Sequence, residues 1–246
     1  FNLYRGYCYG CIIGMAMGMM GCLGVWVTDA IEPEPTNYLE IRYTVDGTYD
    51  FVFYPINPQY VDIDWGNNII KRYDGFVSFT RFVRSGDIIR VYAPENQSQI
   101  LMDGGNQYVN LNLLTACTEI SIDNGTGTSF NLPNDLTSLT ILSLIECANL
   151  ATLTIGSGCS ALGFIDTGSG CGALTTISLP IDLTACEALY FSGCSLSEAS
   201  VNDILTKMDG VVAPGLSVID VSGGTSASPT GAGLVAAASL ISKGVT

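Results

Sequence analysis

The chain has 246 residues, nine cysteines and no histidine; 13% of its residues are charged, and its net charge is −14. A hydrophobic fraction of 48% allows a folded core and excludes wholesale disorder. The acidic balance argues against nucleic acid as a partner, because binding phosphates needs clustered Lys and Arg. Without histidine, the chain lacks the commonest general base and the commonest ligand for transition metals. We therefore expect no catalytic residues, no metal site and no cofactor, although catalysis by carboxylates alone stays open.

Residues 1–30 predict a transmembrane-like α-helix that is apolar and rich in glycine. No charged residue occurs between Gly6 and Thr28, and about 20 apolar residues in a helix span a bilayer. Arg5 precedes this run and Asp29 follows it, so the positive-inside tendency directs the rest of the chain outward. We expect the segment to be buried in lipid or in the core of an assembly.

Four glycines of this segment recur at every fourth position: Gly6, Gly10, Gly14 and Gly18. In a helix these positions share one face, so they form a groove without side chains. Small residues at this spacing let a second helix approach closely in lipid. These glycines are therefore the expected helix-packing site, and other copies of this chain are the expected partners there.

Residues 31–35 predict a stiff acidic linker, because the two prolines of Ile31-Glu-Pro-Glu-Pro35 bar continuation of the helix. Residues 36–105 then alternate apolar and polar side chains, as in Tyr49-Asp-Phe-Val-Phe53. Turn signals such as Asp46-Gly47 separate these runs at hairpin spacing. The pattern predicts a small antiparallel β-sandwich.

One stretch of the predicted sandwich carries a family resemblance. The string Val61-Asp-Ile-Asp-Trp-Gly-Asn67 resembles PKD-like domains of bacterial and phage surface proteins, which have a D-W-G-D-G turn. Asn67 and Asn68 replace the second Asp and the last Gly of that turn. The resemblance implies a PKD-like sandwich, and the two replacements put any function of the acidic turn in doubt.

Residues 106–246 contain an internal repeat of the form Leu-x-x-(Leu or Ile)-x-(Leu or Ile). Its copies are the triplet Leu139, Leu142 and Leu144; the triplet Leu150, Leu153 and Ile155; the triplet Leu174, Ile177 and Leu179; and, ending in Val, the triplet Leu216, Ile219 and Val221. A degraded copy is Leu162, Ile165 and Thr167. The spacing between successive copies is too short for a whole leucine-rich coil. Two successive repeat units, which together span about 24 residues, should therefore make one coil. The pattern predicts a leucine-rich-repeat-like β-solenoid, in which each coil supplies a strand and the complete triplets stack as the core.

A cysteine precedes the first apolar position by three residues in several repeats: Cys117, Cys147, Cys159, Cys171 and Cys186. Free cysteine often behaves as a small buried apolar side chain, so we expect these five to form a buried ladder. In an oxidising setting, a disulfide between Cys186 and Cys194 or between Cys159 and Cys171 is an alternative. Metal binding by Cys8-x-x-Cys11 is not expected, because no second pair follows at zinc spacing.

The end of the chain predicts two helices that cap the solenoid. Ser197 can cap the N-terminus of the first helix. One face of that helix carries Val201, Ile204, Leu205 and Met208. A second helix at about residues 231–243, with Leu234, Leu240 and Ile241, should cover the otherwise open edge of the last coil.

The same region carries the second family resemblance. The strings Cys194-Ser-Leu-Ser-Glu-Ala-Ser-Val-Asn-Asp-Ile-Leu205 and Ile219-Asp-Val-Ser-Gly-Gly-Thr225 resemble the C-terminal leucine-rich-like segment of phage tail and virion proteins and of Bacteroidetes-type surface proteins. The resemblance covers residues 110–246 and is most specific towards the C-terminus. It implies a structural or adhesive role without catalysis.

Two further motifs have simpler interpretations. Gly224-Thr-Ser-Ala-Ser-Pro229 resembles the nucleophile segment of subtilisin-like proteases, but a serine nucleophile needs a base and the chain has no histidine. We expect a loop there. Asp62 and Asp64 share one strand face and are a weak candidate for calcium; a solvated strand face is the favoured interpretation.

These observations predict a mainly β, non-catalytic viral protein: a structural protein of a phage virion that is anchored by its N-terminal helix and displays β-domains outward, for host attachment. The expected partners are copies of itself, other virion or surface proteins, membrane lipid, and a host-surface receptor or glycan. The alternatives are a subunit of a pilus-like extracellular filament and a bacterial cell-surface adhesin. The first residue, Phe1, before an apolar helix resembles processed pilin-like subunits, but Arg5 stands where those subunits carry Glu.

Overall fold

The computed structural model describes residues 38–246 apart from residues 56–59, 93–96, 106, 110, 169 and 212. The predicted N-terminal helix, its four glycines and the linker lie outside the described residues. Within the described part of the chain, no helix is long and apolar enough to cross a membrane, so the transmembrane-like helix has no support from the structure and stays a prediction. Residues Pro35–Thr246 form one compact unit.

The first part of this unit is built from antiparallel strands. They are β1 (Tyr38–Arg42), β2 (Gly47–Pro55), β3 (Tyr60–Asp64), β4 (Ile70–Asp74), β5 (Val77–Val83), β6 (Ile88–Tyr92), β7 (Gln97–Asp103) and β8 (Gln107–Val109). One sheet has five strands in the order β4-β3-β6-β1-β8, and β5, β2 and β7 form the second layer. Alternate side chains such as Ile41 in β1 and Phe51 and Phe53 in β2 are fully buried, as the period-two pattern predicts.

The turn after β3 accommodates the two asparagines of the PKD-like string. The carboxylate oxygen Oδ1 of Asp64 accepts hydrogen bonds from the backbone N–H groups of Gly66 and Asn67, both at 3.0 Å. Gly66 and Asn68 have φ angles of +89° and +56°, in the left-handed region that glycine and asparagine tolerate best. Asn68 can therefore take the left-handed turn without the bulky or β-branched side chain that would strain it.

The second part of the unit is a solenoid of about four turns. Its strands are β9 (Glu119–Asp123), β10 (Ser129–Asn131), β11 (Ile141–Ile145), β12 (Thr152–Thr154), β13 (Phe164–Asp166), β14 (Thr176–Ser178), β15 (Ala188–Tyr190) and β16 (Val218–Asp220), preceded by the 3₁₀ turn η2 (Leu111–Leu113). In parallel register, Ile120 pairs with Leu142, Leu142 with Ile165, and Ile165 with Leu189. These steps of 22, 23 and 24 residues confirm the predicted coil of two repeat units.

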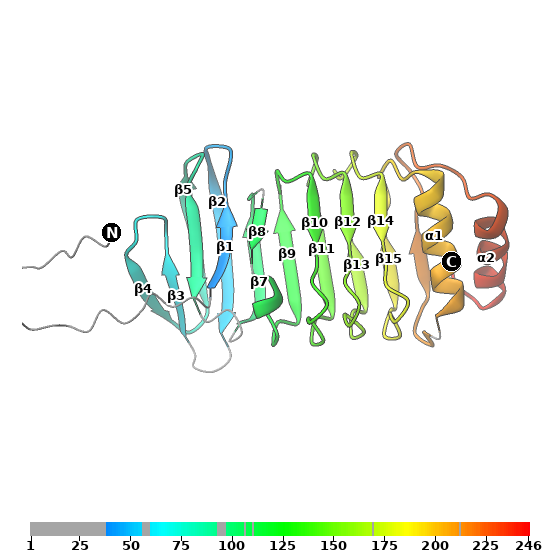
Figure 1. Cartoon of the computed structure of the whole chain (residues 1–246), viewed down its shortest axis with the longest axis horizontal. Helices are drawn as coiled ribbons and strands as arrows, with labels where there is room; N and C mark the ends of the chain where they lie inside the picture. The colour runs from blue at the N-terminus through cyan, green and yellow to red at the C-terminus, as the bar shows by residue number, and fades with distance from the viewer. Residues whose placement is uncertain are drawn as a thin grey trace, which may run out of the picture. The chain divides into compact units, whose positions relative to one another are not determined.

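The two parts share one sheet. Its eight strands follow the order β16-β15-β13-β11-β9-β7-β2-β5, so the solenoid strands continue directly into the sandwich strands (Figure 1). β7 pairs antiparallel with β2 on one side and parallel with β9 on the other. The division expected between residues 36–105 and 106–246 therefore does not coincide with a break in the sheet, and buried side chains from both parts form one core.

The repeat triplets lie in that core, apart from the last one. The side chains of the first three complete triplets are at most 3% exposed. Leu216, Ile219 and Val221 are only partly buried, because the last coil has a neighbouring coil on one side alone. In the degraded copy, Thr167 is fully buried, and its hydroxyl group lies 3.3 Å from the carbonyl oxygen of Tyr190 and 3.3 Å from the Cys194 sulfur. These polar neighbours explain how threonine fits an apolar position.

The third position of a triplet lies just beyond the strand in the three-stranded sheet β10-β12-β14. β12 ends one residue before Ile155, and β14 ends one residue before Leu179. Both side chains are buried, and the backbone N–H of Ile155 donates to the carbonyl oxygen of Ser178 at 2.9 Å. The coil turns here, and the backbone at Gly156 passes so close to Pro133 that an added Cβ atom would lie 2.6 Å from its carbonyl group. Ile155 is therefore a buried core residue at a corner of the coil.

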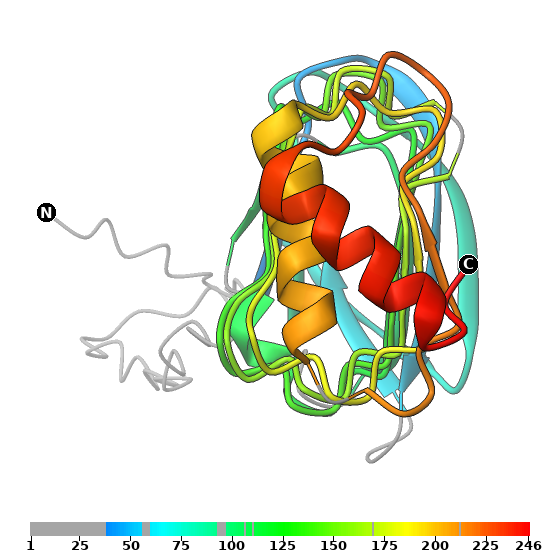
Figure 2. The same ribbon diagram turned by 90° about the vertical axis from the view of Figure 1, so that its right-hand side faces the viewer.

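The two predicted capping helices are present. α1 (Glu198–Gly210) begins at Ser197, whose side chain accepts a hydrogen bond from the backbone N–H of Ser200, and its four predicted apolar residues are buried. α2 (Gly231–Ser242) packs on α1 at the end of the coils (Figures 1 and 2). Of the three residues expected to cover the last coil, only Leu240 is buried. Leu234 and Ile241 point outward instead and are 59% and 70% exposed.

Helix α1 takes the place of a further strand beside β14, the last strand of the three-stranded sheet. The backbone N–H of Ile177 in β14 donates to the hydroxyl oxygen of Ser200 at 2.9 Å. The ammonium group of Lys207 donates to the carbonyl oxygen of Leu179 at 2.7 Å. Side chains of the helix therefore satisfy backbone groups that a next coil would otherwise bind.

Candidate functional site

The outward side chains of the eight-stranded sheet form a registered surface, which we call the outer face. The inward positions of its solenoid strands are apolar, so every second residue points outward. Parallel register aligns these outward residues in rows. One row runs Gln99, Glu119, Ile141, Phe164, Ala188, Val218; the next runs Leu101, Ser121, Ser143, Asp166, Tyr190, Asp220.

Aromatic rings are exposed at both ends of the outer face. Tyr54 of β2 and Phe76, just before β5, are 36% and 59% exposed, and their ring centroids are 4.7 Å apart. Phe164 of β13 and Tyr190 of β15 are 39% and 37% exposed. Exposed rings beside hydroxyl and carboxylate groups are the usual anchors of a recognition surface, because they bury a large apolar area at a small entropic cost. The geometry therefore suits the binding of a partner across the strands.

A row of carboxylates crosses the same face between these two groups of rings. Asp103 of β7 pairs in register with Asp123 of β9. Burial raises the pKa of Asp103, repulsion from Asp123 and Asp50 raises it further, and a 3.1 Å hydrogen bond from the Asn124 side chain opposes the shift. Among the described residues, no group of three or more His, Cys, Asp and Glu side chains is arranged to hold a metal ion.

The calcium candidates Asp62 and Asp64 are engaged by protein groups. Arg72 donates to both carboxylate oxygens of Asp62 at 2.9 Å and 2.7 Å, and its guanidinium group lies 3.7 Å from the ring centroid of Tyr60. Hydrogen bonding to Asp62 is the largest cause that raises the pKa of Arg72. Asp64 receives the turn N–H groups described above and Arg90 at 3.4 Å. The two aspartates therefore have structural partners on β4 and β6.

The protease-like segment 224–229 is a loop that ties the end of the solenoid together. The hydroxyl group of Ser226 donates to the carbonyl oxygen of Cys194 and accepts from the backbone N–H of Leu196, both at 3.1 Å. Asp220 and Ser226 both line a hollow of about 310 Å³, and Asp220 accepts from both the backbone N–H and the hydroxyl group of Ser222. These hydrogen bonds indicate a structural role for Ser226.

Three cysteines stack on consecutive coils, at the corner between the eight-stranded and three-stranded sheets: Cys147, Cys171 and Cys194. The thiol of Cys147 lies 3.8 Å from the carbonyl oxygen of Ile122, and that of Cys171 lies 3.2 Å from the carbonyl oxygen of Leu144. Since Ile122 and Leu144 pair across neighbouring coils, the two thiols occupy equivalent places. Cys194 was not among the cysteines expected in the ladder.

The remaining expected ladder residues lie at other corners of the coil. The N–H groups of Cys117 and Cys186 bond back to Leu114 and Leu183, whereas the carbonyl oxygen of Cys159 receives the N–H of Leu162. The five cysteines are thus buried but divided among three corner positions. All six cysteines in the described part of the chain are free. Neither candidate disulfide pair shares a corner.

Burial also sets the chemistry of these thiols. It raises the pKa of Cys117 and of Cys186 to about 12, and it raises the pKa of Cys159 and of Cys194. Thiols with such pKa values stay protonated at neutral pH, and the thiolate is the reactive form. These four cysteines therefore act as apolar packing groups.

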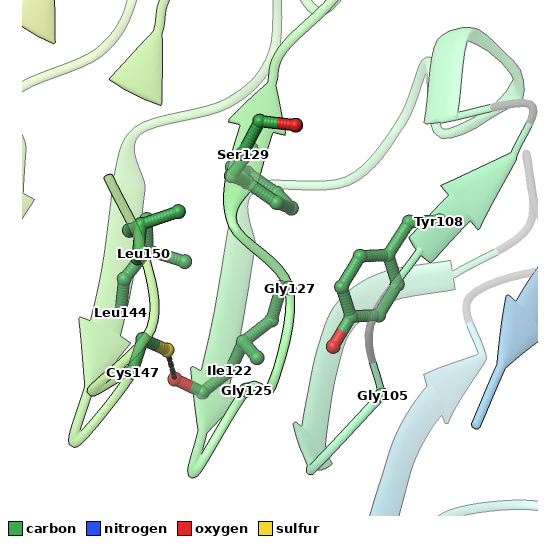
Figure 3. A pocket seen from close by; sticks show the side chains of 10 residues that line it. Gly105, Tyr108, Ile122, Gly125, Gly127, Ser129, Leu144, Cys147 and Leu150 are labelled. Atoms are coloured by element: carbon green, nitrogen blue, oxygen red, sulfur yellow. Dashed lines mark hydrogen bonds between the residues drawn. The ribbon is translucent and has the colours of Figure 1, made fainter. Parts of the chain in front are cut away.

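A small cavity of about 20 Å³ lies between β8 and β10. The ring centroids of Tyr108 and Phe130 are 5.7 Å apart there, and Figure 3 shows Tyr108 on one side and Cys147 and Leu150 on the other. A Cβ atom added to Gly125 would lie 3.0 Å from the sulfur of Cys147. The volume corresponds to about one water molecule, so this cavity is a packing defect where the cysteine stack begins.

Comparison of the chain with protein-family models, with curated proteins and with solved structures finds no match. The PKD-like and phage-type resemblances therefore stay predictions from sequence.

Proposed function

We propose that this chain is a non-catalytic structural protein that displays its β body at the surface of a phage virion, and that the outer face contacts a glycan or receptor of the host. One observation carries the proposal. The eight-stranded sheet presents Tyr54, Phe76, Phe164 and Tyr190 on one registered face beside serine hydroxyls and carboxylates. Such a surface can stack on sugar rings and bond to their hydroxyl groups at the same time.

The chemistry of the described residues supports binding more than turnover. The cysteines of the described residues are buried, and the serine of the protease-like loop is hydrogen-bonded to backbone groups. A net charge of −14 keeps such a module soluble and away from nucleic acid. Assignment to a virion rests on the phage-type strings between Cys194 and Thr225. Anchoring rests on residues 1–30, so membrane lipid and other virion or surface proteins remain proposed partners.

The test is binding of the full chain, in mild detergent, to a glycan array and to intact host cells. Phe164→Ala and Tyr190→Ala should each weaken binding roughly tenfold or more, because each removes an exposed aromatic anchor. Ile181→Ala is the matched control, since Ile181 is 79% exposed outside the strands, and it should bind like the unaltered chain. Equal binding by all three variants would rule out the outer face.

Electron microscopy separates this proposal from its alternatives. Labelling of intact virions by an antibody against residues 38–246 supports the virion protein. Extracellular fibres with this chain as their repeat unit would support the pilus-like subunit instead, and labelling of uninfected bacterial cells would support the adhesin.

A further inference from the structure

Helix α2 is an unusual cap because it carries no charge. The segment between Asp220 and Lys243, which includes the whole helix, contains no charged residue. The terminal unit of a solenoid normally presents a polar outer face to water. A helix that is apolar on all sides is normally covered on all sides. Because the outer side of α2 is not polar, we expect a partner to cover it.

The inner and outer sides of α2 are both apolar. Gly233, Ala236 and Leu240 face the body of the protein and are buried. On the outer side, Leu234, Val235 and Ile241 are 59%, 71% and 70% exposed, and Ala238 lies between them, also exposed. Figure 2 views this end of the molecule directly and shows α2 in front of α1. We call these four outward residues the α2 stripe.

We infer that two copies of this chain pair through the α2 stripe, in an antiparallel helix–helix contact related by a two-fold axis near Ala238. This pairing does not depend on the proposed function. It is also separate from the helix packing expected of the N-terminal glycines.

The stripe is complementary to itself under that symmetry. Leu234 precedes Ala238 by four residues and Ile241 follows it by three, so the three side chains lie along one side of about two helical turns. In an antiparallel pair centred on Ala238, Leu234 of each copy meets Ile241 of the other. The small alanine at the crossing lets the two helix axes approach closely.

Charge favours a second copy as the occupant. Two chains with a net charge of −14 each repel one another over most of their surface. The uncharged α2 segment is a place where two such bodies can touch without bringing carboxylates together. Lys243, next to the C-terminal end of the helix, already forms an ion pair with Asp209 at 2.6 Å. A strongly basic partner would gain nothing from this neutral stripe.

The area fits a weak, reversible pair. The exposed parts of the stripe and of its small neighbours amount to on the order of 500 Å² per copy, or about 1,000 Å² in the pair, which is the size of transient specific interfaces. An apolar patch of this size is also at the upper end of what a monomer leaves uncovered. Pairing should therefore appear at high protein concentration and be lost on dilution.

Cysteine cross-linking of the full chain tests the geometry. In Ala238→Cys the new thiol lies on the two-fold axis, so mild oxidation should link two copies through residue 238. Peptide mass spectrometry distinguishes this bond from any bond made by native cysteines. In Leu234→Cys/Ile241→Cys the mapped bond should join residue 234 of one copy to residue 241 of the other. Ser78→Cys, on the exposed side of β5, is the control and should stay unlinked.

Sedimentation gives the second measurement. Val235→Glu adds a carboxylate to the exposed stripe, so it should abolish the cross-link at residue 238 and lower the concentration-dependent association relative to the parent chain, while leaving the circular dichroism spectrum unchanged. The inference is overturned if Ala238→Cys cross-links no more than Ser78→Cys. A linked peptide that joins residue 238 to a residue outside α2 would equally overturn it, because the partner surface would then not be the same helix.

Discussion

At the residue scale, the outer face contains one carboxyl group, that of Asp103, whose surroundings disfavour its ionised form. Asp103 is flanked by Asp123 and Asp50, and both burial and these neighbours raise its pKa. Its hydrogen bond from Asn124 only partly offsets that effect. The native state therefore holds a carboxylate that is easier to protonate than in the unfolded chain.

The expected consequence is a gain in stability for Asp103→Asn at neutral pH. Between the ordinary pKa of aspartate and the raised value, the folded protein binds more protons, so its stability falls as pH rises through that window. Asparagine removes this loss and keeps the oxygen that accepts from Asn124. The gain should be less than about 1 kcal/mol, because the site is partly solvated, and should shrink towards pH 3.

Urea unfolding of the full chain between pH 3 and pH 7 measures this effect. Asp135→Asn, an exposed carboxylate outside the row, is the control and should unfold like the parent at every pH. If Asp103→Asn is less stable than the parent at pH 7, the ionised carboxylate of Asp103 stabilises the native state, and the predicted gain is wrong.

At the scale of elements, Ser200 decides how the three-stranded sheet ends. Ser200 is 5% exposed, and its hydroxyl oxygen accepts a hydrogen bond from the backbone N–H of Ile177. Ser200→Ala would leave that N–H buried without a partner, which costs about 1–3 kcal/mol. The better helix propensity of alanine returns about 0.5 kcal/mol of this loss. Chemical unfolding should therefore show a net destabilisation.

Thr206→Ala is the matched control for Ser200→Ala. Thr206 is exposed on the same helix, and its hydroxyl group bonds only to Asn202 of that helix. Its replacement should be neutral or slightly stabilising, because only helix propensity changes. If both variants lose stability equally, the strand-capping role of Ser200 is wrong.

The elements show which features a single sequence can reveal. The coil length and α1 were predictable, because Leu142, Leu153 and Val201 follow local periodicities that each element imposes on its own residues. The orientation of α2 was not predictable. Its apolar residues occur on all sides, so Leu234 and Leu240 look equivalent in the sequence although one is exposed and the other buried.

Non-local pairing explains the other differences. Cys117, Cys147 and Cys159 share one local signature, a cysteine three residues before an apolar position, yet the coil places them at three different positions in its turns. The rows of the outer face depend on register between strands more than 20 residues apart, so neither Phe164 nor Tyr190 carried a signal as a site residue.

The repeat pattern also does not predict at which residue each strand ends. Leu144 lies inside β11, whereas the equivalent Ile155 lies just outside β12. The two residues occupy the same position in their triplets, so the pattern cannot tell them apart. Beside Ile155, the backbone at Gly156 approaches Pro133 of the neighbouring coil closely, and the repeat pattern does not encode such a contact between coils.

At the scale of the whole described unit, the shared sheet and common core predict a single unfolding transition. Leu142→Ala in the solenoid should lower the stability by about 2–5 kcal/mol, because it leaves a cavity at a fully buried position. The fluorescence of Trp65 should report the same loss of stability. Trp65 lies in the antiparallel part of the unit, and its ring packs edge-on against that of Phe51, with the centroids 5.2 Å apart.

Fluorescence and circular dichroism together test this prediction. In a Trp26→Phe background, fluorescence reports on Trp65, while circular dichroism reports on all strands. Both midpoints should move together in Leu142→Ala. Ser143→Ala, at the neighbouring outward position of β11, is the control and should move neither. Two separate midpoints would show that sandwich and solenoid unfold independently despite their common sheet.

The continuous sheet also determines how the described body would respond to a mechanical load. Backbone hydrogen bonds between β9, β11, β13, β15 and β16 join successive coils and run along the direction in which the coils stack. A pull between the two ends of the stack would strain one strand pair at a time, so coils would peel away singly. Each coil of about 23 residues would release roughly 8 nm of chain. Under tension, the described body would lengthen in steps and dissipate mechanical energy before all of its coils had unfolded.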